Sequence, residues 1–508
     1  MKVHKGWIAF FVVWGCHRSV EPPPGILRFG FLGTYASLDP IYARDQLSVW
    51  LTQQLFMGLV GYDSTLRPIP AAAACWEISP DARHYRFFLR TELAYAGHPH
   101  RFLKAQDVLY SWHRLADPKL ASPGSYLFRG IIRGWSAYER GQAPYIQGLR
   151  AIGDSIVEVE LEKPYAPFLH LLTIPYAAIV LPEVAQKLGR RFGENPVGLG
   201  PFSLAYHEPG RMVVFRRRGE GLPNKVVFRW FPNRLYAWEA LRRGEIEGFE
   251  GMDKALSYLL HKDSSWTSDA YVLSVPQLGI EYLGMDTRPE SPFSRMERRW
   301  GLRSLVRRCS VAHKLFPGEV TPASTFIPPM LLAHMPTPPE EMDASTAAEQ
   351  LNEITLTLYA SPTFRELCEY LRSCLARQGV RMQVEYLLGP SLREFIIKGK
   401  VHLWKASWIA DFPEGENFLI LFESSQKVPA GPNTTSWSHA QVDSLITLSR
   451  QSPSEWVRRV AYTQAESLIG RGVPVVPLYH GHGTWILSRR VKYFPRSALG
   501  VWLPLYQP

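Results

Sequence analysis

The chain has 508 residues, of which 46% are hydrophobic and 20% are charged. This composition is typical of a folded protein with enough core for two or three domains of roughly 150 residues each. The net charge is +11, but lysines and arginines are scattered and no zinc-finger spacing, RNA-binding signature or basic helix is found. Composition therefore argues against a nucleic-acid-binding protein.

The N-terminus is predicted to be an export signal. Lys2 and Lys5 precede an apolar run over residues 6–15 that is too short to span a bilayer. The run ends at Cys16 and resembles a bacterial lipoprotein cleavage box, although Trp14 stands where a small residue is usual. We therefore expect lipidation of Cys16, with ordinary cleavage nearby as the alternative. No later segment is long and apolar enough to cross a membrane.

Hydrophobic periodicity predicts an alternation of strands and helices along the chain. Strands are predicted at 26–31, 84–90, 156–161, 354–358 and 382–386, and helices at 47–58, 107–115 and 364–375. The last strand, helix and strand cover about thirty residues, which is typical of a parallel crossover unit. The pattern therefore indicates an α/β protein.

The cysteines show neither a CxxC pair nor a metal-ligand spacing. We expect Cys75, Cys309, Cys368 and Cys374 to be small buried hydrophobic residues. Cys368 and Cys374 lie six positions apart on one predicted helix and on different faces, so no disulfide is expected between them.

Few residues suggest catalysis. There is no Gly-x-Ser-x-Gly elbow, P-loop or dinucleotide fingerprint, so the sequence predicts no cofactor and no enzyme. Two close histidine pairs, His98 with His100 and His480 with His482, lack a nearby cysteine or third histidine, which favours structural or surface roles. A secreted metal hydrolase that uses His480 and His482 is the alternative.

Asp411 stands out because it lies in a short apolar stretch, residues 408–413, that enters a Pro-Glu-Gly turn. A carboxylate in such a setting needs a cation or several hydrogen-bond donors to offset its lost hydration. An internal cation would make Asp411 structural, whereas the ammonium of a ligand would make it part of a receptor site. The residues alone leave both interpretations open.

Several motifs occur in an order and spacing that identify a family. In chain order they are Leu38-Asp39-Pro40, Leu55-Phe56-Met57-Gly58-Leu59-Val60, Trp76-Glu77, Phe87-Phe88-Leu89-Arg90, Ala105-Gln106-Asp107-Val108, residues 195–202, Gly244-Glu245-Ile246-Glu247, residues 408–411, Asn417-Phe418-Leu419, Ser436-Trp437, Val442-Asp443 and residues 474–479. With these motifs the chain resembles the extracytoplasmic solute-binding proteins of family 5, which serve peptide, dipeptide and nickel ABC importers, and especially the oligopeptide-binding members. The similarity covers nearly all of residues 26–508.

The resemblance implies an α/β fold of the two-lobed periplasmic binding protein class (type II, cluster C), with an additional domain and a ligand cleft between the lobes. The signal would occupy residues 1–16. The remaining parts would be lobe I in 26–57, 186–272 and 487–508, the additional domain II in 58–185, and lobe II in 273–486.

The resemblance also implies a function, the substrate-binding component of an ABC importer that holds oligopeptides in a closed interlobe cleft. Its partners would be the peptide and the inner-membrane permease subunits, with no nucleic acid. The protein would be a lipid-anchored monomer on the periplasmic or cell-surface side of the cytoplasmic membrane. The same fold could instead bind a glutathione-like peptide, a nickel chelate or haem.

A receptor that ignores peptide sequence must bind groups that all peptides share. By resemblance, Asp411 would bind the α-amine, Lys405 would meet the carboxylate of the peptide, Trp408 would form an apolar wall and Tyr126 would face the pocket. The structural alternatives are an internal salt bridge for Asp411, a surface position for Lys405 and core packing for the two aromatic residues.

Three positions depart from the family pattern. Leu392 stands near a position that often holds a pocket-lining tryptophan, and Lys104 stands where a serine or threonine usually caps the following helix. Arg44 replaces the small or acidic residues that are common after the first motif. We include Arg44 among the candidate ligand-binding residues, because a cation near the cleft would favour an acidic peptide or a peptide-like molecule such as glutathione.

Overall fold

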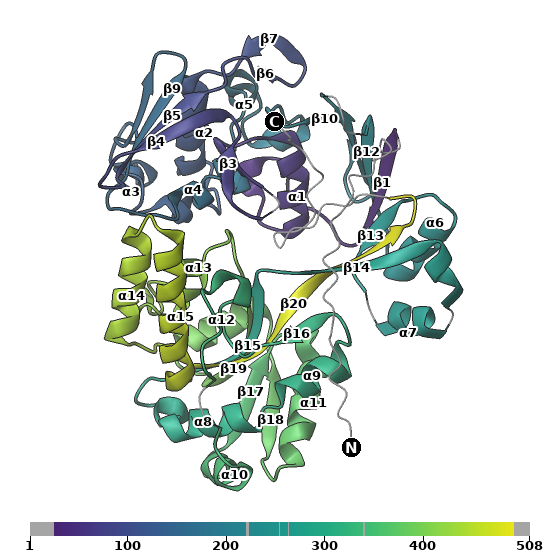
Figure 1. The fold of residues 1–508 in the computed structure, drawn as a ribbon, viewed down its shortest axis with the longest axis vertical. Helices are drawn as coiled ribbons and strands as arrows, with labels where there is room; N and C mark the ends of the chain where they lie inside the picture. Colours follow the sequence, from purple (N-terminus) through teal and green to yellow (C-terminus); the bar gives the residue numbers. More distant parts are fainter. Residues whose placement is uncertain are drawn as a thin grey trace, which may run out of the picture.

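The computed structural model describes residues 25–63, 65–219, 223–252, 254–262, 264–338 and 341–491. The chain forms two lobes joined by paired strands, and an additional domain lies beside the first lobe (Figure 1). The predicted two-lobed α/β fold is therefore confirmed. The expectation for Cys16 and the end of the last lobe I segment lie outside the described residues.

Lobe I is built on one end of a twelve-stranded sheet. Its strands are β10 (Phe202–Glu208), β11 (Met212–Arg217), β12 (Lys225–Trp230), β1 (Ile26–Phe31), β13 (Gly248–Glu250) and β14 (Ala270–Pro276). Its helices include α1 (Gln46–Leu55), α6 (Arg234–Arg242) and α7 (Lys254–Lys262). The rings of Phe29, Phe31 and Trp50 all lie within 6 Å of the Trp485 ring, which forms the centre of this core.

Domain II contains a separate antiparallel sheet. The strand order is β4 (Ala73–Ile78), β5 (His84–Leu89), β9 (Ile156–Glu160) and β8 (Leu149–Ile152), and two small sheets pair β2 (Val60–Tyr62) with β3 (Pro68–Pro70) and β6 (Ala94–Tyr95) with β7 (His98–Phe102). The helices are α2 (Ala105–Ala116), α3 (Trp135–Glu139), α4 (Phe168–Leu171) and α5 (Pro182–Leu188). Fully buried Trp112, Phe128 and Trp135 form the centre of its core.

Lobe II occupies the other end of the large sheet. Its strands are β15 (Gly279–Met285), β16 (Val320–Pro322), β17 (Leu356–Ala360), β18 (Met382–Tyr386) and β19 (Leu403–Ile409). Its helices are α8 (Met296–Leu305), α9 (Arg308–Leu315), α10 (Ala344–Asn352), α11 (Arg365–Ala376), α12 (Gly389–Ile397), α13 (Glu416–Leu419), α14 (Ala440–Gln451) and α15 (Glu455–Gly472). Strands β17 and β18 are parallel, with α11 between them in sequence, which confirms the predicted crossover unit.

Two segments join the lobes at the same place. The long strand β20 (Val475–Ser488) runs from lobe II into lobe I, as the yellow strand in Figure 1 shows. Its first half pairs with β15 and its second half pairs with β14, so the short link between β14 and β15 crosses beside it. At the crossing the Gln277 backbone N–H donates to the Gly481 carbonyl at 2.9 Å. Lobe I and lobe II are therefore joined through this two-stranded connection.

The cysteine expectations are confirmed in part. Cys368 and Cys374 are buried and are not joined by a disulfide. Cys75 and Cys309 are exposed, so their expected burial is wrong. Cys75 lies beside an irregularity in the pairing of β4, and Cys309 lies in the first turn of α9 on its exposed side, so neither faces a core.

The missing serine or threonine cap of α2 is replaced from within the helix. The side chain of Lys104 makes no capping bond, but its backbone N–H donates to Asp107 Oδ2 at 3.0 Å. Arg101 donates to both oxygens of the same carboxylate. The departure from the family pattern at Lys104 is therefore compensated locally.

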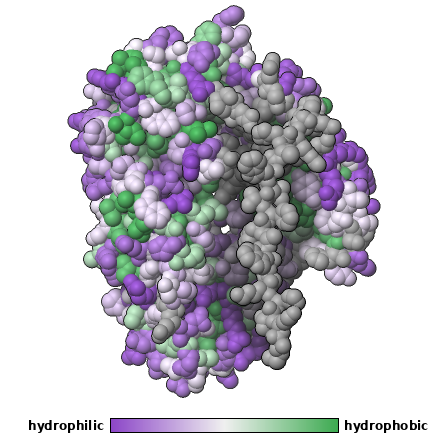
Figure 2. Space-filling model, in the orientation of Figure 1, coloured by the Kyte–Doolittle hydropathy of each residue, from purple (hydrophilic) through white to green (hydrophobic). Residues whose placement is uncertain are grey.

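Hydrophobic residues on the uncovered part of the face shown in Figure 2 form small separate groups among hydrophilic residues. The large apolar side chains are instead concentrated in separate cores for the two lobes and domain II. The two lobes and domain II are therefore each packed around a hydrophobic core.

Gly198 and Gly200 of the 195–202 motif lie against the end of α1. The Gly200 backbone N–H donates to the Leu55 carbonyl oxygen at 2.9 Å, and a Cβ at Gly200 would lie 2.4 Å from the Leu55 carbonyl carbon. Only glycine allows this approach, because the obstructing atoms are backbone atoms that cannot rotate away.

We expect Gly200→Ala to lower the free energy of unfolding by about 1–3 kcal/mol, because the helix end must move to admit the methyl group. Gly219→Ala is the matched control, since Gly219 is exposed and a Cβ there would meet no atom within 4 Å. Urea unfolding followed by circular dichroism measures the difference. Equal stability of the two variants would contradict the prediction.

Candidate ligand-binding site between the lobes

Asp411 lies in the loop that follows β19 and precedes α13. Solvent reaches the Asp411 side chain. The surrounding protein nevertheless restricts the hydration of the carboxylate, which raises the pKa of Asp411. A hydrogen bond from the Asn417 side chain opposes this rise. Within the described part of the chain no cation forms an ion pair with Asp411. The structure therefore does not supply the internal salt bridge that the sequence had left open.

Trp408 holds the residue that contacts Asp411. The half-buried Trp408 indole N–H donates to the Asn417 carbonyl oxygen at 3.0 Å and to Asn417 Oδ1 at 3.1 Å. Because Oδ1 faces the indole, the amide nitrogen of Asn417 is available to the Asp411 carboxylate. Trp408 thus orients Asn417, a contact that the family motif alone did not specify.

A buried carboxylate fixes the loop three residues after Asp411. Arg458 Nη2 and the Tyr462 hydroxyl, both on α15, each donate to Glu414 at 2.6 Å. His170 of domain II completes the group, with Nε2 3.2 Å from Glu414 Oε1. Burial would raise the pKa of Glu414, but the hydrogen bond and charge of His170, together with Arg458, hold that pKa at about 2. Glu414 is therefore ionised and joins domain II to lobe II.

Further contacts between domain II and lobe II surround the same loop. Phe412 is buried in the hydrophobic core of domain II. The Tyr165 hydroxyl donates to Glu416 at 3.0 Å, and the Ala166 backbone N–H donates to the carbonyl of Arg450 at 2.6 Å. Helices α13, α14 and α15 lie next to α3 and α4 at this boundary in Figure 1. Residues 411–416 are thus held between the two bodies.

Two tyrosines of domain II share the region of Asp411. Tyr126 is half exposed, and Tyr176 packs against Gly124, where a Cβ would lie 2.2 Å from the tyrosine ring. Burial and the negative charge of Asp411 raise the pKa of both hydroxyls, that of Tyr176 to about 12. A carboxylate has this effect only at short range, so the structure brings Tyr126, Tyr176 and Asp411 together.

Two arginines stand in the same region. Arg44 lowers the pKa of Tyr176 and Arg393 lowers the pKa of Tyr126, against the larger effects of burial and Asp411. Both arginine side chains are exposed, and neither forms an ion pair with another described residue. Arg44 had been predicted from sequence, whereas Arg393 had not.

The sequence contained a signal for Arg393. Leu392 and Ile396 are buried against Val401 and Trp404, so they form the inner face of α12. Arg393, one position after Leu392, therefore lies on the exposed side of the same helix. The departure at Leu392 therefore concerns the core of lobe II, and its neighbour Arg393 is exposed.

Lys405 is not brought to this region. Its side chain is fully buried in lobe II and forms an ion pair with Glu281. The ammonium nitrogen also lies 3.9 Å from the centre of the Phe364 ring. Burial lowers the pKa of Lys405, and the Glu281 carboxylate opposes this shift. Because its charge is already matched and solvent cannot reach it, we leave Lys405 out of the proposed ligand contacts.

One histidine pair lies on the surface and the other makes hydrogen bonds within lobe II and its connection to lobe I. His98 and His100 lie on the surface strand β7. The buried ring of His480 contacts the carbonyl oxygens of Gly279 and Thr325 at 2.9 and 3.1 Å, and His482 lies between two hydroxyl groups. Among the described residues no group of three His, Cys, Asp or Glu side chains is suited to a metal ion.

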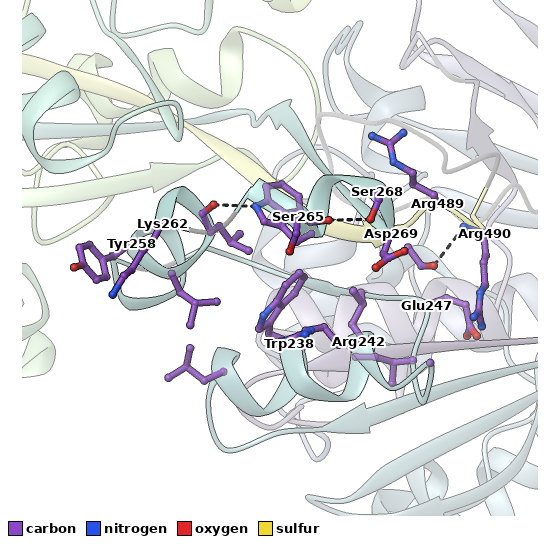
Figure 3. Close-up of a pocket in the computed structure, with 18 residues that line it drawn as sticks. Trp238, Arg242, Glu247, Tyr258, Lys262, Ser265, Ser268, Asp269, Arg489 and Arg490 are labelled. Atoms are coloured by element: carbon purple, nitrogen blue, oxygen red, sulfur yellow. Dashed lines mark hydrogen bonds between the residues drawn. The ribbon is translucent and has the colours of Figure 1, made fainter.

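A separate hollow of about 960 Å³ lies in lobe I, between α6, α7 and the end of β20 (Figure 3). Trp238 and Trp266 contact each other edge to face within its wall, and Tyr258 stands exposed at one end. Every residue that lines this hollow belongs to lobe I. Movement of the lobes would not enclose a ligand there, so we place the candidate site at Asp411.

A profile of bacterial extracellular solute-binding proteins, family 5 (middle region), matches residues 67–429. The chain belongs to this family. The glutathione-binding protein GsiB of Escherichia coli O1:K1 is 24% identical over 493 residues, covering 92% of this chain and 90% of its own. The described chain contains no helix with the length and apolar character that membrane spanning requires.

Solved structures support the same fold. HbpA2 of Haemophilus parasuis superposes with a TM-score of 0.80 at 20% identity, covering 94% of this chain and 98% of its own. DppA of Helicobacter pylori, solved in complex with the peptide STSA, gives a TM-score of 0.74 at 22% identity, covering 92% and 94% of the two chains. The relatives of this family member are binding proteins rather than enzymes.

We expect Glu414→Gln to lower the free energy of unfolding by about 3 kcal/mol at pH 7, because His170 and Arg458 lose the carboxylate that offsets their burial. A depressed carboxyl pKa contributes stability above the unfolded pKa, and this contribution is lost as pH falls through the folded value. The difference between wild type and variant should therefore shrink between about pH 4.5 and pH 2. Urea titrations across this range measure it, and a constant difference would disprove the assignment.

Proposed function

We propose that this protein is the substrate-binding component of an ABC importer and that it captures peptides by their free α-amine on Asp411. The observation that carries the proposal is the unpaired, solvent-reached carboxylate of Asp411, set between domain II and lobe II. A peptide ammonium would supply the counter-charge that the described chain withholds. Family membership supports the transport role.

The surrounding residues have defined parts in this proposal. Asn417, oriented by Trp408, keeps the Asp411 carboxylate in place. The exposed Tyr126 hydroxyl and ring provide a polar and an apolar surface for the first residues of the peptide. Charge-assisted hydrogen bonds of this kind contribute about 1.5–3 kcal/mol each. The buried Glu414 contacts hold domain II and lobe II together beside this site.

The relatives support a peptide ligand without fixing which one. One structural relative is solved with the peptide STSA, and one sequence relative is named for glutathione. Glutathione is a peptide-like molecule with a free α-amine, so it is compatible with amine capture by Asp411. A nickel chelate has less support, because the described residues near Asp411 offer tyrosines and arginines, which are poor ligands for a divalent metal.

We also propose where the protein acts. Cys16 would carry a lipid anchor that keeps the receptor on the outer side of the cytoplasmic membrane. The receptor would be a monomer there and deliver its ligand to the permease subunits. Radiolabelled palmitate incorporation in the host, compared with Cys16→Ala, tests the anchor.

We expect Asp411→Asn to weaken binding of free-amine peptides by about tenfold to a hundredfold, because the ammonium loses an ionic hydrogen bond. N-acetylated peptides should bind poorly to the wild type for the same reason. Isothermal titration with matched free and acetylated peptides measures both effects. Asp154→Asn is the control, since Asp154 is an exposed carboxylate on a surface turn of domain II. Equal binding of acetylated and free peptides would refute amine capture.

Peptide affinity should also depend on pH in a defined direction. Ammonium binding needs the ionised form of Asp411. Because the pKa of Asp411 is higher than that of an ordinary aspartate, the carboxylate becomes protonated at a higher pH. Peptide affinity should therefore fall as pH decreases through this raised pKa. Below this value the dissociation constant should increase up to about tenfold per pH unit. Titrations from pH 7 to pH 3 test this, and Asp411→Asn should lack this component. An identical profile in the variant would exclude Asp411 as the titrating group.

A further inference from the structure

We infer that lobe II carries a second binding site, a cavity that takes the phosphate group of a soluble molecule or of a lipid headgroup. Arg299, Lys427 and the hydroxyl groups of Ser436 and Ser438 would bind the phosphate oxygens. This inference does not depend on the proposed capture of peptides by Asp411.

The cavity has a volume of about 510 Å³, which lies within the usual range for small-molecule sites. Its walls come from three parts of lobe II: residues 287–289 after β15, Ser294 with Arg299 of α8, and residues 427–428 with 436–438 before α14. The Thr287 backbone N–H donates to the Thr435 carbonyl oxygen at 2.9 Å and so joins the first wall to the third. We call this space the lobe II cavity.

The lobe II cavity lies away from the proposed peptide site. The antiparallel pair of β15 and β19 has Gly279 opposite Ile409 at the end near Asp411, and Met285 opposite Leu403 at the end near the cavity. The seven residues of β15 therefore separate the two regions by about 20 Å. Figure 1 also shows α8 toward the end of lobe II that is distant from domain II. A ligand in the cavity would not contact Asp411.

The first argument is a buried guanidinium without a carboxylate. Arg299 lines the cavity and is only 6% exposed. Its Nε donates to the Gly472 carbonyl oxygen at 3.0 Å, and its Nη1 donates to the carbonyl oxygens of Phe293 and Ser294 at 2.6 and 3.0 Å. No described residue accepts a hydrogen bond from Nη2 or forms an ion pair with Arg299. A fixed guanidinium thus keeps one donor nitrogen and its full charge for an anion.

The second argument is a set of further donors in the same cavity. Lys427 Nζ donates to Ser438 Oγ at 3.1 Å and forms no ion pair with a described carboxylate. The ammonium has two more N–H groups, and the Ser438 hydroxyl can still donate its own proton. The Ser436 hydroxyl makes no hydrogen bond with a described residue. A phosphate group has enough oxygen atoms to accept from all of these donors together.

The third argument is the charge of the cavity wall. The described lining contains no carboxylate and three cations, Arg288, Arg299 and Lys427. Asp286 is buried outside this lining and offsets Arg288, whose Nε and Nη2 lie 2.8 and 3.1 Å from its oxygens, and His402 Nδ1 lies 3.1 Å from the same carboxylate.

Two acidic residues close in sequence do not cancel the remaining charge. Glu290 and Glu297 are exposed and lie outside the cavity lining, so solvent screens them. Burial lowers the pKa of Arg299, and the charge of Glu297 only opposes this effect. The wall therefore keeps two positive charges without an ion-pair partner among the described residues, which matches the charge of a phosphate monoester.

Isothermal titration of the purified full chain with inorganic phosphate, glycerol 3-phosphate and succinate tests the site. We expect both phosphates to bind with dissociation constants of about 1 mM or lower, since several charge-assisted hydrogen bonds form at once. Succinate has a similar charge but only two oxygens on each carboxylate, so it should bind at least about tenfold more weakly. Equal binding of succinate and phosphate would overturn the assignment to phosphate.

Lys427→Gln should weaken phosphate binding by about tenfold or more, because one ionic donor is lost. Lys314→Gln is the matched control, since Lys314 is an exposed lysine in the last turn of α9, in the same lobe and outside the cavity. It removes the same charge and should bind phosphate as the wild type does. Equal affinity of the wild type and Lys427→Gln would exclude this site.

A second variant keeps the test independent of protein stability. Arg299 makes three hydrogen bonds within lobe II, so its replacement would disturb the fold, whereas Ser436→Gly removes only a hydroxyl group. Glycine also suits the left-handed backbone of Ser436, whose φ is +58°. We expect Ser436→Gly to unfold at the wild-type temperature in a thermal scan and to bind phosphate more weakly. Wild-type phosphate affinity in Ser436→Gly would remove this hydroxyl from the site.

A flotation assay separates the two sources of the phosphate group. Phosphatidic acid vesicles carry the glycerol phosphate headgroup, and for a lipid ligand they should bind the wild type and Lys314→Gln more strongly than Lys427→Gln. Binding of the soluble phosphates without such a difference would identify a soluble ligand. No binding of any phosphate up to about 10 mM would overturn the inference. Asp411→Asn should retain phosphate binding, so this result and peptide capture can fail separately.

Discussion

The ionised, buried Glu414 holds together the part of the molecule on which the candidate site depends. It connects His170 of domain II to Arg458 and Tyr462 of lobe II, three residues after Asp411. A buried carboxylate with three partners resists displacement, because removing any partner would leave a charge uncompensated. The loop that carries Asp411 is therefore fixed relative to both bodies, while the carboxylate of Asp411 itself stays open to solvent.

The contrast between Asp411 and Lys405 shows how the site differs from its surroundings. Both are charged residues at or beside β19, and the resemblance to the family predicts a ligand contact for each. Lys405 packs against the Phe364 ring and is paired with Glu281, whereas Asp411 lies beyond the strand end and meets no cation among the described residues. The ammonium of a ligand can form an ionic hydrogen bond only where the protein has left a carboxylate without a cation.

The region around Asp411 draws its residues from three parts of the chain. Arg44 comes from lobe I, Tyr126 and Tyr176 come from domain II, and Arg393 comes from lobe II. Relative movement of the lobes would therefore change the distance between the two arginines.

The sequence by itself determined most of the elements and the family, and it singled out Asp411 as a candidate ligand-binding residue. Periodicity placed β1, β5, α2 and the β17–α11–β18 unit, because local burial patterns follow from neighbouring residues. The unusual position of a carboxylate among apolar residues singled out Asp411. Only the tertiary structure decided the partners, since Lys405 meets Glu281 from 124 positions away and His170 of domain II meets Glu414 of lobe II. Such contacts depend on how the folded bodies pack, and no local pattern encodes that packing.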